Sequence, residues 1–471
     1  MKKIVFFLTR LLKSLSKQNF DFLFYIAVFT LPFENLFFAP SKGWATITPL
    51  ILFLYAILNL YHLKPFLAKI RPILLFFICF GLLGTITTII YHGRIDDYFS
   101  ACIPPILGLS CLFSLLEFYT KNQKSHLKQN LNLLASIIVL SYLITLIIGL
   151  IEYLTIKYQL DDLSHFFNFL FKRNYLAKNR IQFFFTEPSF IGMHLFGIML
   201  PLFWLTRRKD LLFLIILYIY SAIFFGAGVR IIIDTLIISV ILSFYYLKKT
   251  KLKLFIPLFA TTLVIFITSV STQNGRFHKI FFGFIDKGTT ATLDCNLTIN
   301  QNNEECLTLF RKSGINSDGS FASRIFRVKS SLFGYLKAPL GATFGYGLGN
   351  SIYPARLGHQ KAKQDYKSSY MKEVNDLENQ NYHDDSVSYC LYTRIISEFG
   401  IFALFLVLFY LYKLAKNSSF EYKFHYLLII LYLYLQFESL SFYAIWFYIA
   451  TMLIFKKISN PQIEKQERIN D

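Results

Sequence analysis

Long runs of apolar residues alternate with short polar turns along almost the whole chain. A run of about 20 apolar residues is long enough for a helix to cross a bilayer core of roughly 30 Å. We therefore predict an all-α polytopic membrane protein with about twelve transmembrane helices. Their expected positions are 20–38, 44–62, 72–91, 99–118, 131–154, 183–205, 210–227, 229–247, 252–272, 389–412, 422–437 and 439–455.

The composition agrees with this pattern. Of 471 residues, 55% are hydrophobic and 18% are aromatic, which is more apolar than is usual for a soluble chain. The net charge of +20 could indicate a nucleic-acid partner. Most of the basic residues, however, lie next to apolar runs, so membrane topology explains the charge better and no nucleic-acid partner is expected.

Lysine and arginine fall mainly on one side of the predicted membrane. One set of connections is rich in them, whereas the opposite short connections hold only Lys42, Arg94 and Arg230. Because basic connections stay in the cytoplasm, we expect both termini to be cytoplasmic and the two long connections to lie outside.

The resulting layout has five parts. Residues 1–19 read as a cytoplasmic interfacial helix rather than a signal peptide, because Arg10 and Lys13 interrupt the apolar run. The other parts are helices 1–9 over 20–272 with an outer loop at 155–182, a large outer loop at 273–388, helices 10–12 over 389–455, and a cytoplasmic tail at 456–471. Within the large loop, 321–340 has a helical apolar pattern.

Two of the six cysteines flank a polar insert in the large outer loop. Cys295 and Cys306 could form a disulfide if this loop faces an oxidising compartment. Closeness in sequence does not ensure that they meet, so a free pair is an equal alternative.

Several charged residues are expected near the outer ends of helices. They are Arg180, Glu187, Arg230, Asp234, Arg394 and Glu398. An ionisable group in or near hydrocarbon is costly unless it is paired or faces water, so these groups are expected to line a water-filled cavity open to the outside. Alternatively, Arg230 with Asp234 and Arg394 with Glu398 are i, i+4 pairs that neutralise each other within the bundle.

Such a cavity would suit a phosphorylated lipid headgroup. The guanidinium fork matches phosphate oxygens at fixed charge. Several arginines could hold a lipid-linked diphosphate and stabilise it as a leaving group.

Other polar residues are candidates for acid–base chemistry. His383 has the pKa range of a general base for a sugar hydroxyl, although a lone loop histidine is more often surface decoration. Asp384 could serve instead or bind a divalent cation. Glu187 could orient an arginine or a sugar hydroxyl, or simply complement a helix N-terminus. Gly347 and Gly349 permit close backbone approach, which is weak evidence for a ligand.

No nucleotide or zinc motif is present in the sequence: there is no Walker motif, dinucleotide fingerprint, HExxH or CxxC. We therefore expect no cofactor and no metal.

Four segments together resemble a known family. They read RIQFFFTEPSFIG from residue 180, GAGVRIII from 226, RVKSSLFGYLKAPLGATFGYGLGN from 327, and DDSVSYCLYTRIISEFGIFAL from 384. In order and topology they resemble the superfamily of O-antigen polymerases (Wzy-type) and O-antigen ligases. The first is similar to its Arg…Phe-x-Glu-Pro-Ser signature, and the last to its closing Glu-x-Gly-Ile motif.

The resemblance implies a GT-C-like inner-membrane glycosyltransferase whose large loop is periplasmic. Its substrate would be oligosaccharide repeats on undecaprenyl diphosphate, needing neither metal nor nucleotide sugar, with a chain-length regulator as a possible partner. Arg230 matches the helix-start arginine of the family, and Arg324 or Arg327 its loop arginine; both are implied diphosphate contacts. Lipopolysaccharide biosynthesis is the implied pathway.

Within the superfamily, the polymerase branch fits better. At the spacing from Glu398 where the ligase branch has a catalytic histidine, this chain has Val387 and Ser388. The ligase, which transfers polysaccharide to lipid A core, remains an alternative. A lipid-linked oligosaccharide flippase or secondary transporter is an alternative of another class, but midplane charges and two related halves would then be expected.

Overall fold

The computed structural model describes residues 20–34, 47–121, 127–160, 163, 166–167, 183–185, 190–225, 229–248, 319–364, 372–379 and 390–456. This part of the chain is all-helical, with one isolated bridge between Ser418 and Lys456. The all-α prediction is therefore confirmed for these residues. The candidate disulfide of Cys295 and Cys306 lies outside them.

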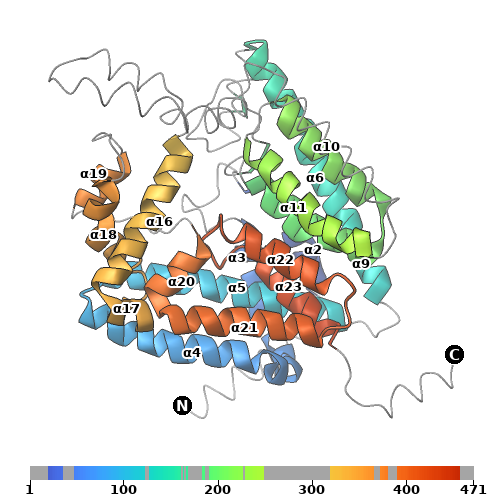
Figure 1. Cartoon of the computed structure of the whole chain (residues 1–471). Coiled ribbons are helices and arrows are strands. Elements are labelled where there is room, and N and C mark those ends of the chain that lie inside the picture. Colours follow the sequence, from blue (N-terminus) through green and yellow to red (C-terminus); the bar gives the residue numbers. More distant parts are fainter. Residues whose placement is uncertain are drawn as a thin grey trace.

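The helices of the described part are arranged as Figure 1 shows. Before the large loop they are α2 (Asp21–Phe29), α3 (Ile47–Leu58), η1 (Leu60–Phe66), α4 (Leu67–Ile90), α5 (Ile95–Lys121), α6 (Leu127–Lys157), α8 (Ile191–His194), the π-helical η4 (Leu195–Met199), α9 (Leu200–Thr206), α10 (Lys209–Phe224) and α11 (Val229–Lys248). Then come α16 (Gly319–Lys337), α17 (Pro339–Phe344), α18 (Ile352–Gln364), α19 (Lys372–Glu378), α20 (Leu391–Phe399), α21 (Ile401–Asn417), α22 (Lys423–Leu433) and α23 (Tyr443–Ile454).

Three helical stretches in the described part are long and apolar enough to cross a membrane. They are Leu60–Ile90, Ile95–Thr120 and Leu127–Thr155, and they coincide with the predicted spans at 72–91, 99–118 and 131–154. The outer face of α4 exposes a run of large apolar side chains, including Ile78, Leu82 and Ile89. A continuous face of this kind is unfavourable in water and is typical of contact with lipid.

The expected helix over 389–412 is interrupted at Gly400, which separates α20 from α21. Gly400 has φ of 89°, a conformation that favours glycine. A Cβ atom there would overlap the backbone oxygen of Thr343 at the end of α17. The break therefore lets α17 pack directly against the α20–α21 junction.

A glycine turn at residues 345–349 joins α17 to α18. Gly347 and Gly349 have positive φ, and a Cβ on either would overlap the backbone at Thr88 of α4 or at Asp97 of α5. The backbone N–H of Tyr346 donates to the Ser397 oxygen of α20 at 2.7 Å. The glycine turn is thus fixed against three helices by backbone contact.

The helices α16, α18 and α19 pack together at one end of α4 and α21 (Figure 1). Their small core includes Phe326, Ile352, Val374 and Leu377. A Cβ on Gly334 would overlap the backbone oxygen of Pro354, and one on Gly358 would overlap that of Ser330. The α16–α18 crossing therefore depends on direct backbone contact.

We predict that Gly334→Ala lowers the free energy of unfolding by about 1–3 kcal/mol, because the added methyl forces α16 and α18 apart. Gly81→Ala is the matched control, since a Cβ at this glycine of α4 meets nothing within 4 Å. Thermal unfolding of the purified protein, with protease sensitivity of the α16–α19 region, measures the effect. Equal losses in the two variants would contradict the close crossing.

Candidate functional site

The first turns of α11 present Arg230 and Asp234, and the side chain of Gln436 lies between them. The Gln436 amide donates from Nε2 to Asp234 Oδ1 at 2.8 Å, while its Oε1 accepts from Arg230 Nε. Arg230 Nη2 also donates to the Gln436 backbone oxygen at 2.9 Å. One amide from the segment after α22 therefore sets the relative position of both charged groups.

The Asp234 carboxylate is buried, at 1% exposure. Its Oδ1 also accepts from the Tyr432 hydroxyl at 2.5 Å. A buried carboxylate is costly without such partners. On the other side, a Cβ on Gly192 of α8 would overlap Asp234 Oδ2, so the missing side chain of glycine makes room for this carboxylate.

Arg230 is held against an aromatic ring as well. Its guanidinium carbon lies 4.9 Å from the centroid of the Phe437 ring. Cation–π contact of this kind favours a fixed orientation of the guanidinium plane. Hydrogen bonds and ring contact together make Arg230 a preorganised cation.

Arg324 of α16 lies near this site. Its positive charge acts on the Asp234 carboxylate, more weakly than that of Arg230. The hydrogen bonds to that carboxylate come from Tyr432 and Gln436. We refer to Arg230, Asp234, Gln436 and Arg324 as the charge cluster.

Two other predicted phosphate ligands have acidic partners elsewhere. Arg327 is 2% exposed, and its Nη2 lies 3.5 Å from Asp376 Oδ2 of α19. Arg394 Nε donates to Glu398 Oε1 at 3.0 Å within α20. The latter contact is the i, i+4 pair that the sequence left as an alternative.

Four candidate residues lie outside the described part of the chain, among them the three proposed for acid–base chemistry. They are Arg180, Glu187, His383 and Asp384. Gly347 and Gly349 are described, and they pack against α4 and α5.

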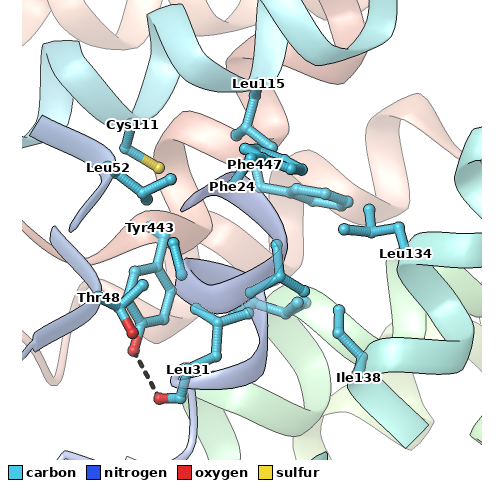
Figure 2. Close-up of a pocket in the computed structure, with 13 residues that line it drawn as sticks. Phe24, Leu31, Thr48, Leu52, Cys111, Leu115, Leu134, Ile138, Tyr443 and Phe447 are labelled. Carbon is cyan, nitrogen blue, oxygen red and sulfur yellow. Dashed lines mark hydrogen bonds between the residues drawn. The ribbon is translucent and has the colours of Figure 1, made fainter. Parts of the chain in front are cut away.

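A small cavity lies inside the helix bundle, apart from the charge cluster (Figure 2). Its volume is about 40 Å³, and its lining is mainly apolar, with Phe24, Leu52 and Leu134 among the residues. The Tyr443 hydroxyl at its edge donates to the Leu31 oxygen at 3.1 Å. A space of this size holds one or two waters at most, so it is a packing gap and not a site for a lipid diphosphate.

Among the described residues, no group of three or more His, Cys, Asp or Glu side chains is arranged to hold a metal.

Sequence reasoning missed a buried polar chain in the bundle. His194 Nε2 lies 2.8 Å from Glu34 Oε1, and its Nδ1 lies 2.6 Å from the Tyr142 hydroxyl. All three side chains are fully buried. The pairing spans 160 residues of sequence, and no local motif signals it.

Glu34 and His194 of this buried polar network also contact residues 183–185, which precede Glu187. The backbone N–H of Glu34 donates to the Phe184 oxygen at 3.1 Å. The rings of Phe185 and His194 lie 4.7 Å apart. The segment after α2 and residues 183–185 are therefore held together next to α8.

Comparison of the chain with protein-family models, curated proteins and solved structures finds no match. Functional inference therefore depends on the residues themselves.

We predict that Tyr142→Phe lowers the free energy of unfolding by about 1–3 kcal/mol, because it removes the hydroxyl that His194 contacts in a buried site. Tyr410→Phe is the matched control: the Tyr410 hydroxyl is buried and has no hydrogen-bond partner among the described residues. Thermal unfolding in detergent compares the two. A smaller loss at Tyr142 than at Tyr410 would argue against the polar chain.

A double-mutant cycle tests the contact between α8 and α11. Gly192→Ala should cost about 1–3 kcal/mol, because its Cβ overlaps Asp234 Oδ2. In an Asp234→Ala background the same change should cost at least about 0.5 kcal/mol less, since the space is then open. Strictly additive losses in thermal unfolding would show that the two residues do not touch.

Proposed function

We propose that this chain is a Wzy-type polysaccharide polymerase. In this proposal it joins oligosaccharide repeats carried on undecaprenyl diphosphate at the periplasmic face of the bacterial inner membrane. A GT-C-like bundle of twelve transmembrane helices with cytoplasmic termini belongs to the same proposal. The observation that carries it is the fixed orientation of Arg230, which Gln436 and the Phe437 ring hold next to the buried Asp234.

The guanidinium groups of the cluster suit an anionic ligand. Arg230 is held in one orientation by Gln436 and by the Phe437 ring. Arginine stays charged at any physiological pH, so its attraction for an anion does not depend on protonation. A diphosphate brings oxygens that suit the guanidinium fork, and each charge-assisted hydrogen bond contributes about 1.5–3 kcal/mol.

In this proposal the preorganised Arg230 has a catalytic role as well as a binding role. In the proposed transfer, the acceptor hydroxyl oxygen forms a bond to the anomeric carbon of the donor. The bond from that carbon to the phosphate oxygen breaks, and undecaprenyl diphosphate leaves with the electron pair. Fixed donors that face the charge developing on the leaving group lower the barrier without reorganisation.

The hydroxyl proton must pass to a base in the same step. His383, Asp384 and Glu187 are the candidates from the sequence. Of these, Glu187 follows the segment 183–185 that is tied to Glu34 and His194.

Replacement of the two arginines in the native host tests the proposal. In a strain deleted for the gene, Arg230→Ala or Arg324→Ala should reduce long-chain polysaccharide by roughly 10²–10³-fold, as expected for loss of one transition-state donor. Arg71→Ala is the matched control, since Arg71 is an exposed arginine near the N-terminal end of α4 and is not part of the charge cluster. Gel analysis of chain length, with immunoblots for protein level, gives the readout.

Two outcomes would contradict the proposal. Unchanged amounts of long-chain polysaccharide in both arginine variants would show that Arg230 and Arg324 do not form a diphosphate site. A deletion strain that caps no repeat unit at all, instead of one, would assign the chain to a ligase step.

A further inference from the structure

The second half of α16 and the whole of α17 expose apolar side chains. Leu336 is 75% exposed and Leu340 is 72% exposed, and Leu332 and Phe344 are also exposed. These four residues, which we call the apolar stripe, are spaced four positions apart. A helix that faces water normally presents polar residues at its exposed positions.

The apolar stripe continues onto a helix of the main bundle. The rings of Phe344 and Phe402 lie 6.2 Å apart, and Phe402 begins an exposed apolar face on α21 that includes Phe405 and Phe409. Figure 1 shows α17 at the end of α4 and α21. The stripe and the outer face of α21 therefore form one surface.

Charge is distributed unevenly along α16. Arg324, Arg327 and Lys329 all precede the start of the apolar stripe at Leu332. At 1.5 Å per residue, Arg324 lies about 12 Å along the helix axis from Leu332. Lys337, near the stripe, turns its Nζ onto the Leu357 oxygen of α18 at 2.7 Å.

From these observations we propose that the second half of α16 and α17 are inserted in the bilayer. Lipid hydrocarbon covers the apolar stripe, in the leaflet of the bilayer that contains the C-terminal end of α4. Continuity with α21 selects lipid over a protein partner, because the exposed phenylalanines of α21 lie on a bundle with membrane-length helices. Polar and apolar halves of one helix are typical of elements at a membrane interface.

Insertion would have a consequence for the charge cluster. The apolar stripe would hold the large loop at the membrane surface, and the polar half of α16 would extend away from the hydrocarbon. Arg324 would then lie at the level of lipid headgroups. Membrane insertion of these helices is inferred from their exposure, sequence and packing and not from the charge cluster, so it stands whether or not the proposed enzymatic function is correct.

Fluorescence quenching in proteoliposomes tests the proposal on the full chain. Leu336→Cys and Leu340→Cys, each in a background whose six native cysteines are replaced by alanine, are labelled with an environment-sensitive dye. Phe405→Cys on α21 serves as the lipid-facing control, and Gln360→Cys, at an exposed position of α18, serves as the water-facing control. Aqueous iodide and nitroxide-labelled phospholipid are the two quenchers.

We expect the dye at positions 336 and 340 to match Phe405→Cys. Nitroxide lipid should quench it several-fold more than at position 360, and iodide several-fold less. Quenching by iodide as strong as at position 360 would place the stripe in water and overturn the proposal. Protection from both quenchers would show that a second copy or another protein covers the stripe, which also overturns it.

Discussion

Backbone contact at the glycine turn sets the position of the large-loop helices. Gly345, Gly347 and Gly349 adopt positive φ and lie directly on the backbone of α20, α4 and α5. Any side chain at these positions would overlap neighbouring backbone atoms. Because the glycine turn fixes α17 and α18, it also fixes α16, which crosses α18 through Gly334. The place of Arg324 at the far end of α16 follows from this constraint.

The charge cluster depends in turn on a neutral residue. Gln436 supplies a donor to Asp234 and an acceptor to Arg230, so that one amide bridges the two charged groups. Arg327 and Arg394 differ, because their acidic partners belong to the packing of α19 and of α20. Gln436 and the Phe437 ring thus fix the orientation of Arg230.

The sequence predicted an all-helical chain, and three of the predicted spans coincide with membrane-length helices, because apolar periodicity and length are local properties. It did not predict the break at Gly400, since the apolar pattern continues through that residue and only contact with Thr343 explains it. Gln436 could not be predicted as a site residue, because an uncharged amide in an apolar run gives no charge signal. The link between Glu34 and His194 joins segments 160 residues apart, beyond the reach of any spacing rule. Arg230 was predicted as a phosphate contact from its place at an outer helix end and from the family resemblance, whereas the choice of Arg324 or Arg327 came from the resemblance.

The central claim is that Arg230 and Arg324 bind the diphosphate of a lipid carrier. Equilibrium binding of undecaprenyl diphosphate to the protein in nanodiscs measures this most directly. The account predicts that Arg230→Ala and Arg324→Ala each raise the Kd at least about tenfold, as expected for loss of one charge-assisted hydrogen bond, while Arg71→Ala leaves it unchanged. Equal affinity in all four proteins would contradict the claim.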